Sequence, residues 1–181
     1  MLRGILKRLQ RRIQMTAIRL RKRAVHAAEL DLHNCWQGIS GCLFFWKGED
    51  SDTTPLHLVL ERMRIRFPGV SVTLVLLPDQ TDSVPMELFE RVIRLEKQHL
   101  NFWGLPTGRV VEKIKATGAE LAVDLSSKFN PLSGYHCLAA KPRLRVGFAG
   151  PSSDLVFNYQ VAPLSQREGI DRYKALARYL G

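Results

Sequence analysis

The chain has 181 residues, enough for one domain and an extension, and its 45% of hydrophobic residues suffices for a packed core, which excludes global disorder. The formal net charge is +10, and the first 23 residues contain nine basic residues and no acidic one, so the remainder is almost neutral. Three cysteines are too few for a disulfide framework, and the N-terminal apolar residues alternate with arginines instead of forming a signal peptide. We therefore expect a chain in the reducing cytoplasm, without a segment that crosses a membrane.

The first predicted element is an amphipathic helix at residues 2–28. Its apolar residues recur at spacings of three and four and form a leucine stripe, which consists of Leu2, Leu6, Leu9, Ile13, Ala17, Leu20 and Ala24. Its basic residues occupy the other faces and are Arg3, Lys7, Arg8, Arg11, Arg12, Arg19, Arg21, Lys22 and Arg23. Repulsion between these charges predicts a helix that is only partly formed in isolation. We divide the chain into a basic helical arm at residues 1–33 and a single α/β domain at residues 34–181.

Strands and helices are predicted to alternate along the domain. Short apolar runs rich in β-branched and aromatic residues predict strands at 39–46, 70–77, 100–103, 121–125, 144–148 and 155–161. Helical periodicity and cap signals, including Thr54 before Pro55 and Asn130 before Pro131, predict helices at 54–67, 84–98, 107–116 and 130–141. A capping box of Ser165 and Glu168 precedes a closing helix. This alternation predicts a three-layer, mostly parallel, Rossmann-like α/β sheet.

Several short motifs follow one another along the domain in a recognisable order. They are Asn101-Phe102-Trp103-Gly104, Asp124-Leu125-Ser126, Pro131-Leu132 and Arg145-Val146-Gly147. With the basic N-terminal helix in front of them, these motifs resemble an uncharacterised bacterial domain family that is common in Bacteroidota, over nearly the whole chain. The resemblance implies a basic helix followed by an α/β body and implies no particular activity.

A second resemblance rests on two strands. The strand that ends in Asp124-Leu125, a helix, and then Arg145-Val146-Gly147-Phe148 are similar to the N-terminal half of heptosyltransferase-like glycosyltransferases. Those enzymes use a second Rossmann-like half to bind the sugar nucleotide, and a chain of this length leaves no residues for one. The resemblance therefore implies a shared fold without the transferase activity.

The charge of the arm is the strongest indication of function. Nine cations within 23 residues neutralise phosphates and release counterions, which favours binding to nucleic acid. Seven of the nine are arginines, whose guanidinium groups fork onto phosphates and stack on bases, and this favours RNA. Two alternatives stay open: the helix lies on an anionic membrane surface, or it is a solvated helix whose leucine stripe packs along the domain.

A possible ligand crevice follows the predicted strand at 121–125. Asp124, Ser126, Ser127 and Lys128 lie between the carboxyl end of this strand and the start of a helix, where open α/β sheets bind ligands and helix N-termini attract anions. No glycine-rich phosphate loop accompanies them, so the alternative is that Asp124 is a loop or capping carboxylate.

Other patterns predict little chemistry. His33, Cys35 and Cys42 contain no Cys-x-x-Cys pair, so we expect no metal site. His136 and Cys137 are adjacent on a helix and point in different directions, which argues against a nucleophile–base pair. The aromatic residues at 101–104 either stack on bases or, more commonly for such clusters, close the edge of the core.

The leading hypothesis from the sequence is a non-enzymatic protein without a cofactor, whose basic helix contacts RNA in association with the ribosome or ribosomal RNA. The first alternative is a scaffold on the inner membrane surface, held by the amphipathic helix while the α/β body binds a protein partner. The second alternative is a degenerate sugar-nucleotide-binding fold.

Overall fold

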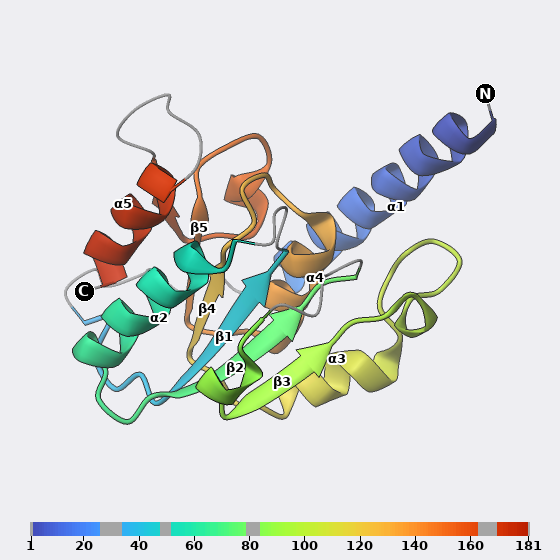
Figure 1. The fold of residues 1–181 in the computed structure, drawn as a ribbon. Helices are drawn as coiled ribbons and strands as arrows, with labels where there is room; N and C mark the ends of the chain where they lie inside the picture. The colour runs from blue at the N-terminus through green and yellow to red at the C-terminus, as the bar shows by residue number, and fades with distance from the viewer. Residues whose placement is uncertain (1, 26–33, 48–51, 79–83, 163–169, 181) are drawn as a thin grey trace.

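The computed structural model describes residues 2–25, 34–47, 52–78, 84–162 and 170–180. Within them, all strands belong to one parallel sheet, and helices lie on both of its faces (Figure 1). The strands are β1 (Gly41–Trp46), β2 (Ser71–Leu76), β3 (Arg91–Arg94), β4 (Leu121–Asp124), β5 (Leu144–Phe148) and β6 (Tyr159–Val161). The predicted Rossmann-like α/β class is confirmed.

The strand order is β3-β2-β1-β4-β5-β6, and every neighbouring pair is parallel. The chain builds outward from β1 to one edge of the sheet, then returns beside β1 and builds to the other edge. The strand order therefore reverses between β1 and β4, which makes this the topological switch point. In open α/β sheets, ligands bind at the carboxyl ends of the strands at such a point.

Helices α2 (Thr54–Arg66) and α5 (Ile170–Leu180) cover one face of the sheet, whereas α3 (Gly108–Lys115) and α4 (Pro131–Ala140) cover the other (Figure 1). Strand β1 is almost wholly apolar because it is covered on both sides. Phe44 and Trp46 enter the core beneath α2 and α5, and Leu43 and Phe45 enter the core beneath α3 and α4.

Helix α1 (Leu2–Ala24) contacts the body at several points between Gln10 and Lys22. Its C-terminal half packs against α4 and inserts Ile18, which is 0% exposed, into the core beneath α3 and α4. Its N-terminal end extends beyond the body (Figure 1). The helix was predicted to extend to residue 28, and residues 26–28 lie outside the described part of the chain.

The helix predicted at residues 84–98 is wrong. The segment contains the edge strand β3, with short 3-10 turns at Met86–Leu88 and Lys97–His99 on either side. Strand pairing with β2 outweighs the weak helical periodicity, because tertiary partners override local propensity.

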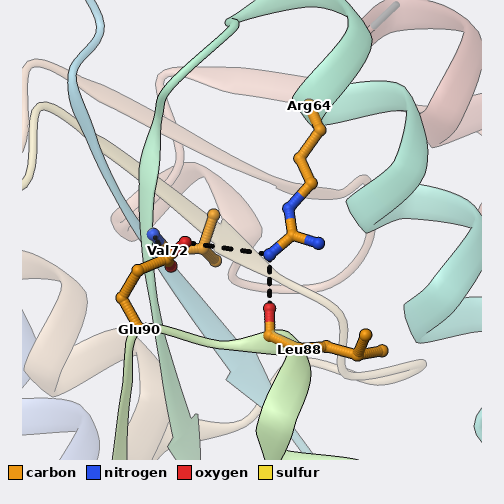
Figure 2. A network of polar contacts seen from close by, with 4 residues as sticks. All are labelled: Arg64, Val72, Leu88 and Glu90. Atoms are coloured by element: carbon orange, nitrogen blue, oxygen red, sulfur yellow. Dashed lines mark hydrogen bonds and ion pairs between the residues drawn. The ribbon is translucent and has the colours of Figure 1, made fainter.

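Polar contacts fasten the beginning of β3 to its neighbours (Figure 2). The Glu90 carboxylate accepts a hydrogen bond of 2.6 Å from the backbone N–H of Val72 and lies 3.7 Å from the Arg64 guanidinium of α2. Arg64 also donates to the carbonyl oxygen of Leu88 at 2.5 Å. One carboxylate thus links an edge strand, its partner strand and the helix above them.

Three smaller predictions also differ from the structure. The strand predicted at 100–103 is a turn closed by a single antiparallel bridge between Leu100 and Pro106. The strand predicted at 155–161 is shortened to β6, because a 3-10 turn occupies Ser153–Leu155. The cap of α2 is Thr53, and the backbone N–H of the predicted cap, Thr54, donates to Asp52 at 2.9 Å. The predicted capping box of Ser165 and Glu168 lies outside the described residues.

Candidate membrane and anion-binding surface

Helix α1 docks on the domain through a face of mixed polarity, on which Met15, and Val25 directly after the helix, also pack against the core. Gln10 and Gln14 donate from their side-chain amides to the carbonyl oxygens of Phe102 and Gly104, at 3.0 and 2.9 Å. One and two turns later, Ile18 is buried and Arg21 donates to the Tyr135 hydroxyl at 2.8 Å. These residues are spaced by three and four positions, so they share one face of the helix.

Most of the leucine stripe lies on a different face, where Leu6, Leu9 and Leu20 point away from the body, whereas Ile13 and Ala17 are half-buried. Leu6 and Leu9 are exposed, Leu20 is 59% exposed, and the neighbouring Ile5 is 61% exposed. The alternative in which the leucine stripe packs along the domain does not hold for these exposed leucines. These exposed side chains form an apolar surface without a partner among the described residues.

The basic residues of α1 divide into three groups. Arg21 and Lys22 hold the helix to the body: the Arg21 guanidinium lies 4.3 Å from the centre of the Tyr135 ring, and Lys22 donates to the carbonyl oxygen of Asp154 at 2.7 Å. Lys7 and Arg11 face a groove that is described below. The cations along the solvent side of the helix are Arg8, Arg12, Arg19 and Arg23.

These solvent-side cations have no carboxylate partner among the described residues. Helix α1 itself contains no acidic residue. The ninth predicted cation, Arg3, lies in α1, but its side chain is outside the described structure.

An aromatic turn lies beside α1. Phe102 and Trp103 are 69% and 38% exposed, and their rings meet edge to face at 5.0 Å. The Asn101 side chain accepts hydrogen bonds from the backbone N–H groups of Trp103 and Leu105, and Gln10 attaches the turn to α1. The interpretation that these aromatics close the edge of the core is wrong, because both rings are open to solvent.

A basic groove of about 400 Å³ opens where α1 crosses the carboxyl edge of the sheet. Its walls come from α1, from the residue that follows β1, and from the loop that leads into α4. The lining residues are Lys7, Gln10, Arg11, Gln14, Lys47, Lys128, Phe129, Asn130 and Pro131. Four of these are cations and none is acidic, so the groove favours an anion.

The predicted crevice residues contribute unequally to this groove. Only Lys128 lines it. Asp124 and Ser126 are buried, and Asp124 accepts hydrogen bonds from the backbone N–H of Ser126, at 2.9 Å, and from the Ser133 hydroxyl. Ser127 is half-buried, and its carbonyl oxygen accepts a hydrogen bond from Arg172. The structure thus places Asp124 as a link between β4 and α4, which favours the capping interpretation.

Burial raises the pKa of Asp124 to about 6, although hydrogen bonds from Ser133 and Ser126 oppose the shift. The Ser133 hydroxyl also lies 2.9 Å from the carbonyl oxygen of Asn130. The Ser133 hydroxyl has one proton but lies near two acceptors, the Asp124 carboxylate and the Asn130 carbonyl oxygen. When Asp124 is protonated it donates to the Ser133 oxygen, and the Ser133 proton is then free to bond to Asn130.

Sequence reasoning missed Lys47 and Phe129 as residues of the groove. Lys47 directly follows β1, and only the sheet order reveals that β1 and β4 are neighbours at the switch point. Asn130 does cap α4 as predicted, since its side chain accepts from the Leu132 backbone N–H at 2.9 Å.

Thiol and imidazole groups offer no second centre in the described residues. Burial raises the pKa values of the Cys42 and Cys137 thiols, which keeps them protonated. Burial and the nearby Arg21 guanidinium lower the pKa of His136 to about 3. No three histidine, cysteine or acidic side chains of the described residues come together as metal ligands.

Among the described helices, none combines the length and the apolar character needed to cross a bilayer.

Comparisons with known proteins bear on the fold alone. No protein-family model matches the chain, and no curated protein is similar to it in sequence. Among solved structures, the ADP-heptose LPS heptosyltransferase II of E. coli is similar with a TM-score of 0.53 and 15% identity. The match covers 76% of this chain and 40% of that enzyme, so the chain spans less than half of the protein it resembles. The chain therefore has the Rossmann-like α/β fold of a glycosyltransferase structure.

Proposed function

We propose that the protein binds peripherally to an anionic membrane surface, with α1 lying in the plane of the interface. The observation that carries the proposal is the exposed part of the leucine stripe, Leu6, Leu9 and Leu20, which is flanked by arginines that have no carboxylate partner among the described residues. A helix with one apolar face, one cationic face and no acidic residue has the composition of an interfacial anchor.

The distribution of exposed apolar side chains supports this proposal. Two of the large exposed hydrophobic residues in the described chain, Ile65 and Tyr179, lie elsewhere. The others belong to α1 or to the turn that it holds, and they are Ile5, Leu6, Leu9, Leu20, Phe102 and Trp103. Full burial of one such aliphatic side chain contributes roughly 1.5–3 kcal/mol, so partial insertion of several contributes enough for reversible binding. Trp103, in the turn that Gln10 joins to α1, is a residue of the type found at the level of the lipid headgroups.

The charges support an anionic bilayer over a neutral one. Arg8, Arg12, Arg19 and Arg23 lie on the solvent side of α1. Each cation close to an anionic membrane contributes about 1 kcal/mol, and this attraction weakens with salt.

Other partners account for less of this surface. RNA would occupy the cations but leave the leucine stripe in water. A second copy of the chain would place arginines against arginines, because α1 supplies no carboxylate to oppose them. The predicted role of the body as a scaffold for a protein partner has no particular observation in its favour.

Sedimentation with lipid vesicles tests the proposal. The full chain is expected to sediment with phosphatidylcholine vesicles that contain phosphatidylglycerol, and to remain in the supernatant with phosphatidylcholine alone. The double variant Leu6→Gln/Leu9→Gln is expected to lose most of the binding, since glutamine preserves helix propensity while removing the apolar surface. The matched control is Ile65→Gln on α2, whose side chain is 62% exposed and distant from α1.

Undiminished binding of the double variant contradicts the proposal, as does failure of the unaltered chain to bind anionic vesicles. If ribosomal RNA instead binds the chain with the same affinity for both variants, RNA binding through the cations replaces membrane binding as the function.

A further inference from the structure

We propose that the basic groove between α1, Lys47 and the loop before α4 is a binding site for a phosphorylated small molecule. The site is separate from the leucine stripe, which lies on a different face of α1. The inference therefore does not depend on membrane binding.

The first reason is the place of the groove in the sheet. Lys47 directly follows Trp46, the last residue of β1, and Lys128 lies between β4 and α4. Strands β1 and β4 are parallel neighbours, so both lysines lie at the carboxyl edge of the sheet, beside its switch point.

The second reason is that α1 brings two further cations to this edge. Lys7 and Arg11 line the same groove, although about 120 residues separate them from Lys128 in the chain. The hydrogen bonds from Gln10 and Gln14 to the aromatic turn hold this part of α1 in position. The wall that α1 contributes to the groove is therefore held in place by hydrogen bonds to the aromatic turn.

The third reason is that no negative charge among the described residues neutralises the four cations of the groove. None of the four cations forms an ion pair there, and no carboxylate lines the groove. Four positive charges around one depression repel each other until an anion enters. The N-terminus of α4, an α-helix of ten residues, adds a positive end of a helix dipole.

The size and lining indicate the class of ligand. A groove of about 400 Å³ has the volume of a site for a small organic molecule, not only for an ion. Phe129 and Pro131 provide an apolar wall next to the cations, on which an organic group would lie. A phosphomonoester or diphosphate matches four cations better than a singly charged carboxylate does, because it carries more negative charge and more acceptor oxygens.

Calorimetric titration of the full chain with inorganic pyrophosphate, at physiological ionic strength, tests the site. We expect saturable binding that is weakened at least tenfold in Lys47→Gln/Lys128→Gln. The matched control is Lys113→Gln, which removes an exposed lysine of α3 and leaves the groove unchanged. All four cations of the groove are exposed, so the variants are expected to fold, and circular dichroism checks this.

Vesicles distinguish the two sources of such a phosphate. If pyrophosphate does not bind, but Lys47→Gln/Lys128→Gln weakens binding to phosphatidic acid vesicles and not to phosphatidylglycerol vesicles, the ligand is a phosphomonoester headgroup. If pyrophosphate binds and vesicle binding is unchanged in the variant, the ligand is soluble. Absence of both effects, or equal losses in Lys113→Gln, overturns the inference. Either result leaves the test of the leucine stripe intact, because Leu6 and Leu9 are unaltered.

Discussion

Gln14 donates a hydrogen bond of 2.9 Å to the carbonyl oxygen of Gly104, and this contact joins residues that lie 90 positions apart in the chain. Gly104 has a φ of +69°, and a Cβ atom at this position would lie 2.7 Å from the Gln14 amide nitrogen. The turn thus needs a glycine both for its left-handed backbone and for the approach of α1.

Gly104→Ala is expected to lower the free energy of unfolding by about 1–2 kcal/mol, because alanine is strained at positive φ and displaces Gln14. Urea denaturation measures this change. The matched control is Gly108→Ala, whose Cβ would meet nothing within 4 Å at the start of α3. The control is expected to be neutral or stabilising, since alanine favours the helix. Equal destabilisation by both substitutions would contradict the proposed role of Gly104.

Shortening a side chain to alanine is expected to lower stability on the docked side of α1 and not on its exposed side. Ile18→Ala removes a fully buried side chain from the core and should cost about 2–4 kcal/mol of stability. Leu20→Ala removes a side chain that is 59% exposed and should change stability by less than about 0.5 kcal/mol. Thermal unfolding and vesicle sedimentation together check the assignment: Leu20→Ala should weaken membrane binding, and a reversed pattern of stability would show that the docked face is wrong.

Asp124 is expected to make the protein less stable as the pH rises. Because burial raises its pKa in the folded chain to about 6, the folded state binds a proton more tightly than the unfolded state does. This contribution is complete below the unfolded pKa of about 4 and is lost as the pH rises through 6, with a total of about 3 kcal/mol.

Asp124→Asn is expected to flatten the dependence of the unfolding free energy on pH between about 4 and 7. Asparagine still accepts from the Ser126 backbone N–H and donates to the Ser133 hydroxyl, so the link between β4 and α4 is preserved. Urea titrations at several pH values provide the measurement. An unchanged slope in the variant would show that another group carries the dependence.

Glu90→Ala is expected to loosen the β3 edge of the sheet by about 1–2 kcal/mol, because it leaves the part-buried N–H of Val72 without its acceptor. Hydrogen exchange at this amide should accelerate. Glu87→Ala, at a nearby exposed carboxylate, is the control and should leave the exchange rate unchanged. Identical exchange in both variants would show that the Glu90 contact does not protect the strand.

The sequence was sufficient for much of the sheet. Strands β1, β2, β4 and β5 are buried on both faces, so each appears as a short apolar run between turn residues, and each was predicted near its true bounds. The edge strand β3 was missed because its partner is on one side only. The sequence Arg91-Val92-Ile93-Arg94 mixes charged and apolar residues, and that mixture also fits a helix.

The candidate surfaces were predicted only in part. The spacing of leucines identifies an amphipathic helix, but it does not say which side of that helix meets the body. Here Gln10, Gln14 and Ile18 make that contact, and two glutamines are no sequence signal for docking. Of the groove, Lys128 was predicted at a ligand crevice, but its union with Lys7 and Lys47 was missed, because these residues become neighbours only through the sheet order and the position of α1.

The position of β1 at the centre of the sheet also has a consequence for biosynthesis. Its neighbour β4 is translated only after α2, β2, β3 and α3 have been made, so one edge of the most apolar strand has no partner while they emerge. Parallel pairing between such distant segments is slow, and unpaired apolar edges favour aggregation. A nascent chain of this protein should therefore need chaperone protection until the segment at 121–124 leaves the ribosome.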